Sequence, residues 1–263
     1  MIDHPLDILR TEEDELALLD IEDLDVEEDL TSPLDAFVDE PIAAKPDPDE
    51  MLALLQSAEP GQRMLAARAF CEIQDSRSIP LLMGLITDPC PLIRVSVAYA
   101  LGRNTSPEVV LPLIQQLQTD WNGYARKGIV WALGNCHDRQ TIAPLIHALK
   151  TDIPAVRLWA ASSLAQAAVL GYELVLTVIP PLIEAMVNDP ISAVRSNSAW
   201  SIGRLCRELP SNVVYATAVD ALIEVVAEDA DLGVRADAKS ALLKLGDPRG
   251  MQIIETLEQL ESQ

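Results

Sequence analysis

The sequence has few aromatic residues, no long apolar run and no closely spaced cysteines. Aromatic residues make up 4% of its 263 residues, whereas hydrophobic residues make up 49% and are mostly Ala, Leu, Ile and Val, which favours helices over strands. No apolar stretch reaches the roughly 18 residues of a membrane span, and the amino terminus is too acidic for a signal peptide. The four cysteines lack the spacing of a disulfide framework. We therefore expect a soluble, cytoplasmic, all-α protein.

Basic residues are also scarce, and the acidic ones are unevenly distributed. The formal net charge is −22, from 41 acidic and 19 basic residues. Residues 1–47 contain 17 acids and two bases, a net charge of −15, so the other 216 residues have a net charge of −7. A nucleic-acid site needs a dense basic surface, so this balance argues against nucleic acid as a partner.

The acidic segment 1–47 is predicted to be a largely disordered tail ahead of a folded domain at 48–263. Prolines at positions 41, 46 and 48 crowd the boundary. Within the tail, DELALLDIEDLDVEEDL intersperses leucines with carboxylates. The segment is either a solubilising arm or a motif that becomes ordered on a basic, apolar groove, belonging to a partner or to this protein itself.

The folded domain is predicted to be a repeat array, because an arginine recurs at intervals of 31, 32, 31, 38 and 40 residues. In most copies an acidic residue precedes the arginine. A helix that contains alanines and a Leu-Gly pair follows it. The recurring arginines are Arg63, Arg94, Arg126, Arg157, Arg195 and Arg235. A preceding helix in each repeat is marked by Pro80, Pro112, Pro144, Pro181 and Ala221. Proline suits a first helical turn, so we expect these prolines to mark helix starts.

This pattern resembles the HEAT family, and more narrowly the HEAT-like repeats of cyanobacterial phycobilisome (bilin) lyases, over about residues 48 to 250. The resemblance implies an alpha-alpha superhelix, a HEAT-like solenoid of about six helix pairs. It also implies a structural ladder in which turn aspartates pair with helix arginines of adjoining repeats. The implied ladder residues are Asp88, Asp120, Asp152, Asp189 and Asp229 with the six arginines named above.

The helices that follow the arginines also contain a candidate binding groove. Counted from each arginine, positions −1, +3, +7 and +10 form the predicted buried stripe, and positions +2, +5 and +9 point away from it. The resemblance places these helices on the concave side. The predicted partner-binding groove contains Arg68, Tyr99, Arg103, Trp131, Asn135, Trp159, Trp200 and Arg204. Aromatic residues could instead fill gaps between helices, and Trp159 at +2 lies nearer the packed side.

Candidate metal and catalytic residues are sparse. Cys136 and His137 are the only adjacent pair of potential soft ligands, which makes them a metal-site candidate. The candidate is weak, because a structural metal site needs several ligands that converge on the ion. The chain contains no glycine-rich phosphate loop, paired-carboxylate signature or nucleophile elbow. We therefore expect no cofactor and no independent catalysis.

Two functions follow from the resemblance. The first is a non-catalytic scaffold or adaptor that binds a partner protein in its concave groove; an A-type iron–sulfur carrier is one such partner, known for another cyanobacterial HEAT-repeat protein. The second is a bilin lyase or phycobilisome-associated subunit that handles phycobiliproteins or bilin. Isolated arginines in the groove could bind the propionates of a bilin. Repeat folds host many functions, so both hypotheses rest on analogy.

Overall fold

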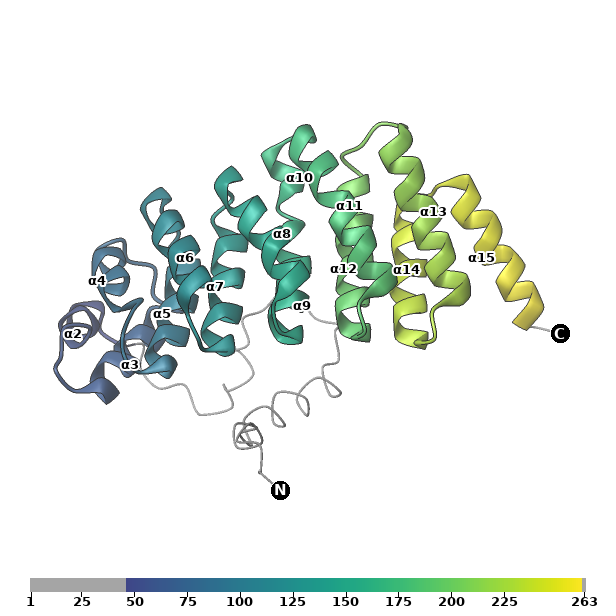
Figure 1. Ribbon diagram of the computed structural model, residues 1–263. Coiled ribbons are helices and arrows are strands. Elements are labelled where there is room, and N and C mark those ends of the chain that lie inside the picture. Colours follow the sequence, from purple (N-terminus) through teal and green to yellow (C-terminus); the bar gives the residue numbers. More distant parts are fainter. Residues whose placement is uncertain (1–45, 262–263) are drawn as a thin grey trace, which may run out of the picture. The chain divides into compact units, whose positions relative to one another are not determined.

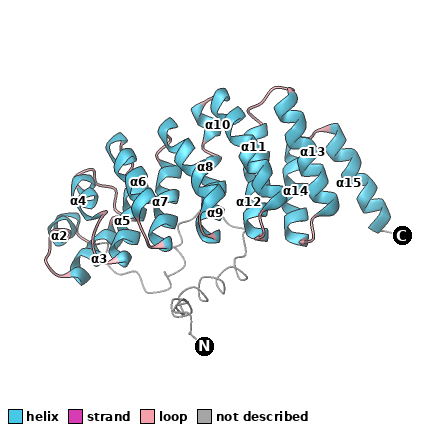
Figure 2. Cartoon of the chain, in the orientation of Figure 1, coloured by secondary structure: helices cyan, strands magenta, loops and turns pink. Residues whose placement is uncertain are grey.

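The computed structural model describes residues 46–261, and every regular element in that range is helical (Figures 1 and 2). The chain divides into two units, Met1–Ala44 and Lys45–Gln263. The predicted acidic tail and its leucine-containing motif lie outside the described residues. No helix among those described is long and apolar enough to cross a membrane.

The helices alternate between two rows along the chain, which confirms the predicted all-α repeat solenoid (Figure 1). The first helices of the repeats are α2 (Pro48–Leu54), α4 (Ser78–Leu85), α6 (Pro107–Thr119), α8 (Ile142–Thr151), α11 (Tyr172–Asn188) and α13 (Val213–Glu228). The second helices are α3 (Pro60–Ala69), α5 (Pro91–Arg103), α7 (Gly123–Asn135), α9 (Pro154–Leu164), α12 (Ser192–Cys206) and α14 (Leu232–Leu245). The helix α15 (Pro248–Glu261) packs on α13 and α14.

Two short helices lie between the paired helices of the repeats. The 3-10 helix η2 (Arg139–Thr141) leads directly into α8, and the short helix α10 (Ala167–Leu170) lies between α9 and α11. The residues of α10 fall inside the 38-residue interval between Arg157 and Arg195. This insertion explains why that repeat is longer than those before it.

The hydrophobic core lies between the two rows. Leucines from both rows are fully buried there, including Leu101 and Leu133 from second helices and Leu113 and Leu145 from first helices. The predicted stripe at positions −1, +3 and +7 is therefore confirmed for α5 and α7. One helix pair cannot enclose such a core by itself, so each repeat depends on the neighbours that it stacks against.

The expectation that prolines mark the starts of first helices is wrong for two of them. Pro112 lies inside α6 and Pro181 lies inside α11, each well after the first turn. Both helices extend upstream because residues before the proline are buried, such as Val109 in α6 and Val178 in α11. That burial outweighs the backbone hydrogen bond that each internal proline removes.

The Leu-Gly pattern of the repeats lets successive second helices approach closely. A Cβ atom added at Gly102 would lie 2.5 Å from the Trp131 ring and 2.9 Å from the Cα atom of Ala132 in the next second helix. The equivalent position in α12, Gly203, lies against Ala241 in the same way. Each glycine stands eight residues after its repeat arginine, so the motif has a packing role.

Candidate partner-binding face

The recurring arginines and aspartates form ion pairs between adjacent repeats. Arg94 donates from Nε and Nη2 to the two carboxylate oxygens of Asp120, both at 2.7 Å. Their side chains are 5% and 0% exposed, so this pair is deeply buried. The same arrangement joins Arg63 to Asp88, Arg126 to Asp152, Arg157 to Asp189 and Arg195 to Asp229.

Each of the five paired arginines also holds the turn of its own repeat. The Nη1 atom of Arg94 donates to the carbonyl oxygen of Asp88 at 2.8 Å, and Arg63 donates to that of Ser57 at 2.9 Å. Because this contact uses a backbone oxygen, it tolerates the serine that replaces the acid in the first repeat. The hydrogen bonds from Arg195 lower the pKa of the Asp229 carboxyl below its ordinary value, against the effect of burial.

Charge is partitioned between the two rows of helices. The first helices contain eight acids and one base, Lys150. The second helices contain one acid, Asp237, and twelve bases: Arg63, Arg68, Arg94, Arg103, Arg126, Lys127, Arg157, Arg195, Arg204, Arg235, Lys239 and Lys244. Five of these bases pair with ladder aspartates in the adjoining turns, so the second helices retain seven further bases against one acid in a strongly acidic protein.

Four of these bases lie against tryptophan rings: the ladder arginine Arg94, and three that are not part of the ladder. The guanidinium carbon of Arg103 is 5.7 Å from the ring centroid of Trp131, and that of Arg204 is 5.8 Å from Trp200. The Nζ atom of Lys127 is 6.0 Å from the centroid of Trp159. Arg103 and Arg204 are exposed, whereas Lys127 is half-buried. We refer to Arg68, Arg103, Lys127, Trp159, Trp200 and Arg204 as the cationic face.

Two aromatic residues of the predicted groove are not available to a partner. Tyr99 and Trp131 are only 4% and 6% exposed, and their ring centroids lie 5.3 Å apart between α5 and α7. Placing them on the open surface was therefore wrong. The space beside Gly102 admits the Trp131 ring into the helix interface, and the Arg103 guanidinium covers it.

The other predicted groove residues are more accessible. Arg68 is exposed, and Asn135, Trp159 and Trp200 are half-buried. Trp159 is thus more accessible than Trp131, the reverse of what its position nearer the packed side indicated.

Sequence reasoning missed a second group of accessible apolar side chains, at the turns that lead into the second helices. Trp121 is 72% exposed, and its ring centroid lies 5.5 Å from the guanidinium carbon of Arg94. Leu92, Tyr124 and Ile153 at neighbouring turns are also exposed. The only signal in the sequence was the position of Trp121 directly after a ladder aspartate. We call these four residues the apolar edge.

The weak metal candidate has a geometry that disfavours metal binding. The thiol of Cys136 donates to the carbonyl oxygen of Ala132 at 3.2 Å, and burial raises the pKa of this thiol to about 12. His137 adopts a positive φ of 48° just beyond α7, with Nδ1 2.8 Å from the carbonyl oxygen of Asn135. Among the described residues, no group of three or more His, Cys, Asp or Glu side chains could hold a metal ion.

Comparisons with known proteins agree with this architecture. A family model described as HEAT repeats matches residues 48–113, 110–178 and 179–260. No curated protein sequence matches the chain.

Two solved structures illustrate the similarity. The complex of CpcE and CpcF of phycocyanin lyase from Nostoc sp. PCC7120 has 21% identity and a TM-score of 0.56, and the match covers 78% of this chain and 79% of that one. A designed armadillo repeat protein in complex with the peptide (KR)4 has 17% identity and a TM-score of 0.56, with coverage of 76% and 99%. At these identities the similarity establishes the fold alone.

Proposed function

Because the chain belongs to the HEAT-repeat family, we propose that it is a non-catalytic scaffold that holds a partner protein against its second helices. The partner presents a segment that combines carboxylates with large apolar side chains. The observation that carries this proposal is the segregation of charge: apart from the five arginines that pair with aspartates in the ladder, the second helices contain seven bases and one acid, in a chain whose net charge is −22.

The cationic face matches the carboxylates of such a segment. Arg103 and Arg204 are exposed and lie over tryptophan rings, which limit the orientations that each guanidinium adopts. Arginine presents several donors in a plane and can pair with a carboxylate through two hydrogen bonds. The designed armadillo repeat protein is known with a basic peptide, (KR)4; the charge of this face favours an acidic one.

The apolar edge supplies the anchor for the apolar side chains of the partner. Trp121 has most of its surface exposed, and the ladder guanidinium beneath its ring is fixed by two hydrogen bonds to Asp120. A large ring held in one place loses little conformational freedom when a partner covers it, which is why tryptophan is enriched among binding hot spots. We expect Trp121 to contribute more to affinity than any single charge.

The proposal is tested by measuring the affinity of a labelled synthetic peptide in which Glu and Leu alternate. Arg103→Ser with Arg204→Ser is expected to weaken binding by about 10-fold or more, since pairs with charged groups contribute about 1.5–3 kcal/mol. Trp121→Ala is expected to weaken binding at least as much. Lys150→Ser removes one charge from the first-helix row and serves as the control for the loss of affinity per charge. An equal loss per removed charge in Lys150→Ser and in the double arginine variant, with no loss in Trp121→Ala, would show that net charge alone attracts the peptide.

A bilin lyase or phycobilisome-associated role is the second candidate, favoured by the structural similarity to the CpcE–CpcF complex. Exposed arginines of the cationic face could pair with the propionates of a bilin. Mixing the protein with bilin and an apo-phycobiliprotein separates the two candidates. A time-dependent change in visible absorbance with turnover would support the lyase role, and a stoichiometric complex without turnover would support the scaffold. No observation on the described residues favours an iron–sulfur carrier as the partner.

The same peptide assay tests whether the acidic tail competes with a partner for the cationic face. The sequence of the tail has the chemistry that we assign to the partner, with 17 acids and interspersed leucines in residues 1–47. If the tail competes for the cationic face, deletion of residues 1–45 raises the affinity for the Glu/Leu peptide. Unchanged affinity would exclude this competition and leave the proposed partner site intact.

A further inference from the structure

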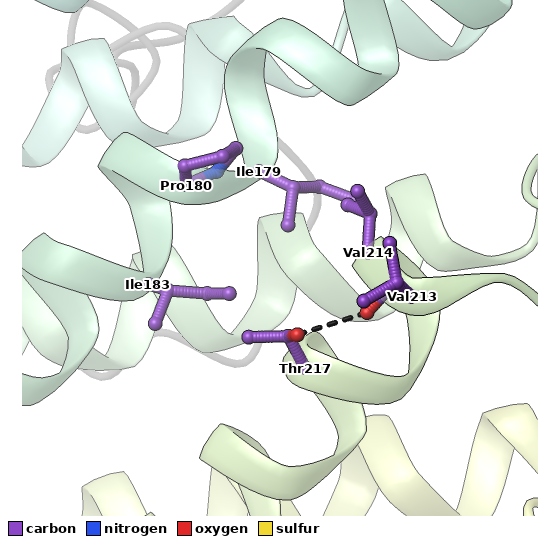
Figure 3. A pocket seen from close by; sticks show the side chains of 6 residues that line it. All are labelled: Ile179, Pro180, Ile183, Val213, Val214 and Thr217. Carbon is purple, nitrogen blue, oxygen red and sulfur yellow. Dashed lines mark hydrogen bonds between the residues drawn. The ribbon is translucent and has the colours of Figure 1, made fainter.

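The first-helix row contains an apolar notch between α11 and α13, on helices that do not belong to the proposed partner face (Figure 3). Its volume is about 270 Å³, and it is lined by Ile179, Pro180, Ile183, Val213, Val214 and Thr217. This volume is below the roughly 300–1,000 Å³ of typical small-molecule sites. The notch therefore suits one or two side chains of a protein better than a cofactor.

The walls of the notch are apolar because its one hydroxyl is already satisfied. The Oγ1 atom of Thr217 donates to the carbonyl oxygen of Val213 at 2.8 Å, one turn back in α13 (Figure 3). The threonine then offers its methyl group to the notch. Val213 at the mouth is 78% exposed, although it is a branched aliphatic residue.

One side-chain hydrogen bond links the starts of the two helices at the mouth of the notch. Asn212 accepts from the backbone N–H of Tyr215 at 2.9 Å and so caps the start of α13. The amide nitrogen of the same side chain donates to the hydroxyl of Tyr172 at the start of α11, at 3.1 Å. The notch is thus preformed, which lowers the cost of filling it.

The two helices that line this notch are acidic. The helices α11 and α13 contain five acids and no bases within their bounds. Glu173 and Glu224 lie seven residues from Pro180 and Thr217, spacings that place them on the notch side of their helices. Glu184 and Asp220 instead pair with Lys150 of α8 and Arg249 of α15, the helices beyond α11 and α13.

From this combination we infer that the notch is a second docking site, which takes a basic amphipathic segment of another protein. A branched aliphatic or aromatic side chain fills the notch, and lysines or arginines on either side face the carboxylates of α11 and α13. This inference is independent of the proposed function, because it uses the opposite row of helices and a partner of opposite charge. A scaffold with both sites would join an acidic partner to a basic one.

The test compares two synthetic peptides of equal length and charge, one with Lys and Leu spaced along an amphipathic helix and one with every Leu replaced by Ser. The full chain is expected to bind the Lys/Leu peptide about 10-fold more tightly or better, as burial of one leucine implies. Val213→Asp is expected to abolish this preference. Leu111→Asp, at an exposed position of α6, adds the same charge elsewhere on the first-helix row and should leave the preference intact.

Two results would overturn the inference. Equal affinity for the two peptides would mean that only charge attracts them. Self-association of the chain that Val213→Asp removes, without any preference between the peptides, would assign the notch to a second copy of the protein. Because Val213 is exposed, its substitution should not disturb folding, and helical content measured by circular dichroism checks this point.

Discussion

The second helices approach one another more closely than the first helices do, and a glycine from each row illustrates the difference. A Cβ atom at Gly102 in the second-helix row would meet a tryptophan ring at 2.5 Å, whereas one at Gly84 in the first-helix row would have nothing within 4 Å. The second-helix row is also joined by buried ion pairs, while the first-helix row has prolines inside α6 and α11 and leaves a notch open. Close packing fixes the positions of charged groups on one row, and looser packing leaves apolar surface on the other.

Breaking one ladder pair is expected to have the largest effect on stability. In Asp120→Asn the buried guanidinium of Arg94 loses its charged partner, which typically costs about 3–5 kcal/mol. Glu184→Gln is the matched control in the first-helix row, since the Lys150–Glu184 pair has the same separation of 2.7 Å but is exposed. Its loss should cost about 0–1 kcal/mol. Urea denaturation gives the free energy of unfolding of both variants, and equal losses would contradict a difference between the rows.

The same pair predicts how stability depends on pH. Burial by itself raises the pKa of Asp120, but hydrogen bonds from Arg94 and Gln116 outweigh it, so the pKa lies below its ordinary value of about 3.9. A depressed carboxyl pKa stabilises the fold at higher pH, and this contribution is lost as the pH falls through the folded value. The stability gap between the protein and Asp120→Asn should be constant from about pH 7 to 5 and shrink below about pH 4. A gap that does not change at low pH would rule out this linkage.

The close approach of the second helices is tested with paired glycine substitutions. Gly102→Ala should lower the free energy of unfolding by about 1–3 kcal/mol, because the new methyl group meets both a ring and a backbone atom. Gly84→Ala should raise it by about 0.4–1 kcal/mol, because alanine restricts the unfolded chain and favours a helix without a clash. Thermal unfolding followed by circular dichroism measures both. A stabilising Gly102→Ala would show that the helices separate at little cost.

The architecture could be predicted from the sequence because its signals are local and repeated. The spacing of Asp, Arg and apolar positions within each segment indicates paired helices and the buried stripe. The burial of Trp131 could not be predicted, because it depends on the missing side chain of Gly102 in the neighbouring helix. The accessibility of Trp121 depends in the same way on Arg94, which comes from the previous repeat. Pro112 and Pro181 misled the prediction of helix starts because upstream burial extends both helices past them.

Apart from the Glu184→Gln control, the smallest expected loss of stability is that of Trp121→Ala, and it distinguishes a residue that binds a partner from one that packs in the core. Trp121→Ala removes a ring that is 72% exposed and contacts the Arg94 guanidinium, so it should cost only about 0.5–1 kcal/mol of stability. Trp131→Ala, in the interface of α5 and α7, should cost about 3–5 kcal/mol, as is typical for a buried tryptophan. In the Glu/Leu peptide assay the order should reverse, with the larger loss of affinity in Trp121→Ala, measured at a temperature where both variants are folded. If Trp131→Ala lowered affinity more while remaining fully helical, the partner would contact the interior of the second-helix row, and the apolar edge would lose its assigned role.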